Sequence, residues 1–102
     1  MEPLGWPEVK AALERFLVVD VRDPEEFRRG SLPGAVNLPL EALARRVYTL
    51  QRDRPLLVVC RMGQKSSLAG LYLEADGYQV YVLKGGLSAI PEEERKSLSI
   101  AL

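Results

Sequence analysis

The chain has 102 residues, of which 47% are hydrophobic and 27% charged, and its 14 acidic residues balance 14 basic ones. This composition predicts one globular domain over residues 1–102, with no overall charge to attract nucleic acid or an anionic membrane. The chain has no histidine and one cysteine, Cys60, which excludes Ser-His-Asp and Cys-His catalysis, an intramolecular disulfide and the usual zinc sites.

Predicted helices and strands alternate along the chain. In chain order they are a helix over 7–16, a strand over 17–21, a helix over 24–29, a brief strand over 35–37, a helix over 40–50, a strand over 56–60, a helix over 66–76 and a strand over 79–83. Asp23 is expected to cap the second helix, and Gly77 to end the last one. The alternation predicts an α/β fold, with a mostly parallel sheet covered by helices on both faces.

The N-terminus gives no sign of export. Residues 1–7 lack the basic flank and apolar run of a signal peptide, and no apolar stretch approaches the roughly 20 residues that cross a bilayer. We therefore expect a cytoplasmic protein with no membrane partner.

Cys60 stands where a buried strand runs into a short loop. Gly63 permits a tight reversal with positive φ, and Ser66 can begin the next helix, so successive N–H groups would point inward as an anion-binding cradle. Arg61 and Lys65 add positive charge. Cysteines in such settings have a pKa of about 3.5–7.5, so we expect a thiolate nucleophile that needs no base. The alternative is that Cys60 is a small buried hydrophobe.

The loop and further segments resemble the rhodanese family. The family's active-site loop has a cysteine first, a glycine fourth and often a basic sixth residue, as Cys60, Gly63 and Lys65 are here, with lysine where arginine is frequent. Ser31 stands where the family frequently has histidine. The resemblance implies a rhodanese-like fold of about five mostly parallel strands, with a short first strand near Leu4. The other similar segments are Asp20-Val-Arg22-Asp-Pro-Glu-Glu26-Phe27, Gly30-Ser-Leu-Pro33-Gly34-Ala35-Val-Asn37-Leu-Pro39 and Lys84-Gly85-Gly86.

The same resemblance implies sulfurtransferase activity without a cofactor or metal. The Cys60 thiolate would take a sulfane sulfur from an anionic donor such as thiosulfate, forming a persulfide. With no second cysteine, the chain would pass the sulfur to an external acceptor: cyanide, a thiol or a sulfur-relay protein. The loop residues expected to bind the donor are Arg61, Met62, Gly63, Gln64, Lys65 and Ser66.

Other functions remain open at this point. The domain could be a sulfur carrier loaded by a desulfurase, or a catalytically silent interaction module. A cysteine phosphatase is disfavoured, because that loop needs an arginine six residues after the cysteine, where Ser66 stands. Asp20 and Arg22 are expected to support the site, and we favour structural roles for both: Asp20 capping loop amides, and Arg22 pairing with Glu26.

Overall fold

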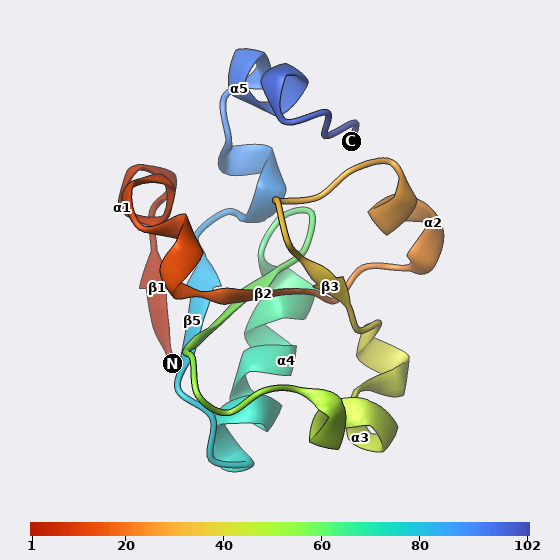
Figure 1. Cartoon of the computed structure of the whole chain (residues 1–102). Helices are drawn as coiled ribbons and strands as arrows, with labels where there is room; N and C mark the ends of the chain where they lie inside the picture. Colours follow the sequence, from red (N-terminus) through yellow and green to blue (C-terminus); the bar gives the residue numbers. More distant parts are fainter.

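The sheet has five strands, as the resemblance implies, and all of them are parallel, which confirms the predicted mostly parallel sheet (Figure 1). The computed structural model describes residues 1–102. The strand order is β1-β5-β4-β2-β3, so β4 lies at the centre. The strands are β1 (Glu2–Leu4), β2 (Leu17–Asp20), β3 (Val36–Asn37), β4 (Leu56–Val59) and β5 (Val80–Leu83).

Helices cover both faces of this sheet, and each face has its own core. Because side chains alternate along a strand, Leu56 and Val58 of β4 enter one core while Leu57 and Val59 enter the other. All four are fully buried, and each such burial stabilises the fold by about 1.5–3 kcal/mol. The helices are α1 (Trp6–Ala11), α2 (Pro24–Arg28), α3 (Leu43–Arg46), α4 (Gln64–Ala75) and α5 (Glu92–Ser97), with short 3₁₀ turns η1 (Leu13–Arg15), η2 (Leu40–Ala42), η3 (Val47–Thr49) and η4 (Gly86–Ala89).

Two of the predicted helices are shorter than expected. The helix expected over 40–50 is broken into η2, α3 and η3, and the hydroxyl of Tyr78 donates to the carbonyls of Val47 and Leu50 at its end. The helix expected over 7–16 stops at Ala11, because Ala12 leaves the helical conformation, and the chain resumes as η1.

Of the two predicted helix ends, the stop at Gly77 is confirmed, but the side-chain cap by Asp23 is not formed. Gly77, at φ +95°, follows α4 as predicted. Asp23 does occupy the N-cap position of α2, but its side chain makes no capping hydrogen bond. Asp23 is exposed, so water can satisfy the first N–H groups of this short helix. None of the helices is long and apolar enough to cross a membrane.

Glu94 ties α5 to α1. Its Oε1 accepts a hydrogen bond from Trp6 Nε1 at 3.0 Å and lies 2.7 Å from Lys10 Nζ. The bond from Lys10, and then that from Trp6, lower the pKa of Glu94 below its ordinary value of 4.5. The stabilisation is therefore present above about pH 4.5 and is lost as the pH falls through the folded-state pKa.

We accordingly expect Glu94→Gln to lower the free energy of unfolding at neutral pH, and the deficit to shrink as the solution is acidified. Urea unfolding at neutral pH and at about pH 3 measures this. Glu93→Gln is the matched control, since the exposed Glu93 side chain has no ion-pair or hydrogen-bond partner. A deficit that does not change with pH would contradict the ionic contribution of Glu94.

Candidate active site

The sulfur of Cys60 lies inside a cradle of hydrogen-bonding groups. Gly63 N–H donates to Sγ at 3.0 Å and Ser66 N–H donates at 3.3 Å. Ser66 Oγ also lies 3.3 Å from Sγ, and this hydroxyl becomes a donor when the sulfur is ionised. Cys60 and Ser66 are both buried, so these groups act on the sulfur where water competes little. The arrangement can hold a negative charge on sulfur.

The loop gains this shape from a glycine and a helix start. Gly63 has φ +101° and is the N-cap residue of α4, which makes α4 begin two residues before the predicted Ser66. Ser67 donates to the Gly63 carbonyl through its amide at 3.2 Å and its hydroxyl at 2.7 Å. Because the positive end of the α4 dipole faces the loop, it favours an anion there.

The chain after β5 holds the loop in place. Figure 1 shows this segment beside the chain after β4 at one end of the sheet, where Leu87 N–H donates to the Cys60 carbonyl and Ser88 N–H to that of Arg61, each at 2.9 Å. A Cβ at Gly86 would lie 2.6 Å from both carbonyl oxygens. Glycine is therefore needed at position 86 for the two segments to approach.

A hollow of ≈220 Å³ opens beside the sulfur. Arg61 and Lys65 are exposed, and neither forms an ion pair, so both are free to meet an anion. The complete lining is Arg22, Glu26, Cys60, Arg61, Met62, Gln64 and Lys65. The predicted loop residues thus come together around one space, with Gly63 and Ser66 holding the sulfur.

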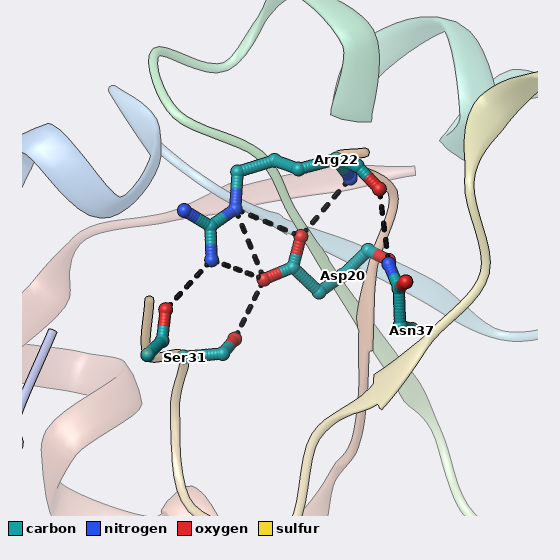
Figure 2. Close-up of polar contacts among 5 residues, drawn as sticks. Asp20, Arg22, Ser31 and Asn37 are labelled. Atoms are coloured by element: carbon teal, nitrogen blue, oxygen red, sulfur yellow. Dashed lines mark hydrogen bonds and ion pairs between the residues drawn. The ribbon is translucent and has the colours of Figure 1, made fainter. Parts of the chain in front are cut away.

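Asp20 and Arg22 form a buried ion pair, shown in Figure 2, and Arg22 of this pair lines the hollow. The Nε of Arg22 lies 3.0 and 3.1 Å from the Asp20 carboxylate oxygens, and its Nη2 lies 2.8 Å from Oδ2. The Arg22 backbone N–H also donates to Asp20 at 3.0 Å, as the predicted amide cap requires. The expected pairing of Arg22 with Glu26 is wrong, because the buried carboxylate two residues earlier takes the guanidinium.

Neighbouring polar groups complete this pair. Ser31 Oγ donates to Asp20 Oδ2 at 2.7 Å, and Arg22 Nη2 donates to the Gly30 carbonyl at 2.8 Å. Asn37 Nδ2 donates to the carbonyls of Asp20 and Arg22, at 3.0 and 2.9 Å (Figure 2). Ser31, where histidine is frequent among the proteins that the sequence resembles, is therefore part of the support of Asp20. Asp20 itself does not line the hollow.

Glu26 lines the hollow, and sequence reasoning did not place it there. Its only signal was that it falls on the helix directly after β2, near the carboxyl end of the sheet. Because Arg22 pairs with Asp20, Glu26 has no ion-pair partner. The lining thus contains one carboxylate, Glu26, and two cations, Arg61 and Lys65, that have no ion-pair partner.

Other parts of the chain offer weaker sites. A larger hollow of ≈390 Å³ lies beside β3, but its lining has no thiol and only one charged residue, Arg46. No three metal-binding side chains come together anywhere in the structure. Cys60, the single thiol of the chain, therefore lies in the hollow that also has cations without ion-pair partners.

Comparison with known proteins agrees with this geometry. Residues 6–93 match the rhodanese-like domain family. The thiosulfate sulfurtransferase GlpE of Shewanella oneidensis is 45% identical over 73 residues, which cover 71% of this chain and 72% of that protein. A sulfurtransferase of Allochromatium vinosum is 38% identical over 80 residues, covering 78% of this chain and 75% of the relative.

Solved structures show the same similarity. A rhodanese-related protein from Thermoplasma volcanium has a TM-score of 0.86 at 27% identity, covering 91% of this chain and 93% of that one. A rhodanese homologue from Thermus thermophilus has a TM-score of 0.74 at 44% identity, covering 87% of this chain and all of the other. The likeness therefore extends over most of the chain and shows the same fold.

Proposed function

The chain belongs to the rhodanese-like domain family of sulfurtransferases, and we propose that it moves a sulfane sulfur from an anionic donor such as thiosulfate to a thiophilic acceptor through a persulfide on Cys60. The observation that carries this proposal is the convergence of the Gly63 and Ser66 amides and the Ser66 hydroxyl on Cys60 Sγ. These groups stabilise a thiolate, which is the reactive form of cysteine.

In the first half of the reaction the Cys60 thiolate attacks the outer sulfur of thiosulfate. A new S–S bond forms to Cys60 as the S–S bond of thiosulfate breaks, and sulfite leaves with the bonding electron pair. Arg61 and Lys65 would bind the donor's oxygens by charge-assisted hydrogen bonds. Because Lys65 is a point charge without a guanidinium fork, it fixes the orientation of the donor less tightly than arginine would.

In the second half the acceptor attacks the outer sulfur of the persulfide. The S–S bond to Cys60 breaks, and its electron pair returns to Cys60 as a thiolate. Cys60 is therefore nucleophile in one half and leaving group in the other, and no proton is moved at its sulfur. This accounts for how a chain without histidine can perform the reaction.

The loop favours sulfur transfer over phosphate chemistry. The position that a cysteine phosphatase fills with arginine is Ser66, whose buried side chain contacts the Cys60 sulfur. No guanidinium is available there to clamp a phosphate in two places. Both loop features that a sulfur-transfer site needs, the cysteine and the glycine at position 63, are present.

Intact mass spectrometry of the wild-type chain tests the proposal. We expect incubation with thiosulfate to add one sulfur atom, and cyanide to remove it with the release of thiocyanate. If thiosulfate adds no sulfur but a desulfurase-generated persulfide does, thiosulfate is not the donor, and the alternative of a sulfur carrier loaded by a desulfurase is favoured. If neither donor adds sulfur, the proposed function is wrong.

A further inference from the structure

Helix α4 is apolar on its outer face as well as its inner one. Its inner face packs Ala69 and Leu73 into the core. On the outside, Met62 of the loop is 60% exposed, Leu68 is 61% exposed and Leu71 is 57% exposed. Helices that are apolar on both faces are normally covered on both. We call Met62, Leu68 and Leu71 the outer ridge.

The outer ridge forms one wall of a groove of ≈590 Å³ between α4 and the β5–β1 edge of the sheet. This groove adjoins the hollow at Cys60, because Met62 and Gln64 line both. A protein seated in the groove would therefore reach the mouth of the sulfur site. Because the chain has no second cysteine, the persulfide sulfur has to leave on another molecule, and that molecule must be able to reach this mouth.

The charges around the groove indicate which kind of protein segment would bind in it. Lys84 lines the groove, and Arg61 and Lys65 line the adjoining hollow; none of the three forms an ion pair. Glu26 is the one free carboxylate among them. The surface is thus an apolar centre with a cationic rim, and its complement is an apolar segment flanked by carboxylates.

We propose that this groove docks a protein acceptor, whose apolar and acidic segment seats on the outer ridge and presents a cysteine to the Cys60 persulfide. The proposal rests on the proposed function and names its acceptor. The acceptor cysteine gives its proton to solvent, and its thiolate attacks the outer sulfur of the persulfide. The S–S bond to Cys60 breaks, and Cys60 regains its thiolate as the acceptor becomes a persulfide.

Single-turnover transfer from the persulfide-loaded chain tests the proposal. The acceptors are cyanide and two synthetic peptides, each with one cysteine and several leucines, one rich in glutamate and the other in lysine. The test variant is Leu68→Ser with Leu71→Ser. The control is Tyr48→Ser on η3, which removes a large side chain that is even more exposed, at 79%, and does not line the groove.

We expect the wild type to transfer to the glutamate peptide about tenfold faster than to the lysine peptide. The ridge variant should lose about tenfold with the glutamate peptide, since burial of two leucines is removed, and should match wild type with cyanide. Tyr48→Ser should match wild type with every acceptor.

Three outcomes overturn the proposal. The first is equal rates for the two peptides on the wild type. The second is a ridge variant that equals wild type with the glutamate peptide. The third is a wild-type dimer in sedimentation that the ridge substitutions dissociate without changing transfer, which would make the groove a contact between two copies. Loss of cyanide transfer by the wild type would instead count against the proposed function.

Discussion

Cys60→Ser is expected to reduce sulfur transfer from thiosulfate to cyanide by at least about a thousandfold, to the uncatalysed level. A serine hydroxyl is far less acidic than a thiol and cannot form a persulfide, so the first half of the reaction has no nucleophile. The measurement is thiocyanate formation, together with intact mass after thiosulfate, which should show no added sulfur.

The substitution is designed to leave the fold intact. A serine oxygen can still accept hydrogen bonds from the Gly63 and Ser66 amides that now reach Sγ, so these buried donors stay satisfied. Cys60→Ala removes that acceptor and should lose the same activity with a larger loss of stability. Thiocyanate formation by Cys60→Ser at more than a few per cent of the wild-type rate would show that the sulfur travels by another route. If Cys60 were only a packing residue, Cys60→Ser and the wild type would form thiocyanate at the same rate.

The sequence was sufficient to predict the sheet because its information is local. Three apolar runs rich in β-branched residues stand where β2, β4 and β5 lie, and both faces of such strands are buried in a parallel sheet. The cradle was predictable for a similar reason. One glycine with positive φ, Gly63, and the helix start after it are enough to turn the amides toward Cys60.

The features that the sequence did not predict depend on distant partners. The break-up of the helix expected over 40–50 involves Tyr78, which follows α4 in the sequence and whose hydroxyl donates to the carbonyls of Val47 and Leu50. For Arg22 the sequence offered two carboxylates, and the choice of Asp20 over Glu26 depends on which of them the fold buries. The outer ridge was equally hidden, because Leu68 and Leu71 alternate with the buried Ala69 and Leu73 on one helix.

Asp20→Asn is expected to have the largest effect on stability of any single polar substitution in this chain. The Asp20 and Arg22 side chains are 0% and 3% exposed. Removing one charge of a buried pair leaves the other uncompensated, which costs about 3–5 kcal/mol. A domain of this size has about 5–15 kcal/mol to lose, so the midpoint of thermal unfolding should fall by on the order of 20 °C. Urea unfolding followed by the fluorescence of the buried Trp6 gives the free energy directly.

The matched control is Asp76→Asn. Asp76 also pairs with an arginine at 2.8 Å, Arg52, but the two side chains are 41% and 56% exposed. Solvent screens that pair, so we expect a loss below about 1 kcal/mol. Equal losses in the two variants would mean that burial does not set the cost of breaking the Asp20–Arg22 pair. A double variant, Asp20→Asn with Arg22→Met, removes both charges and should recover part of the stability. Recovery of stability without recovery of sulfur transfer would give Arg22, which lines the hollow, a role in binding the donor beyond its structural one.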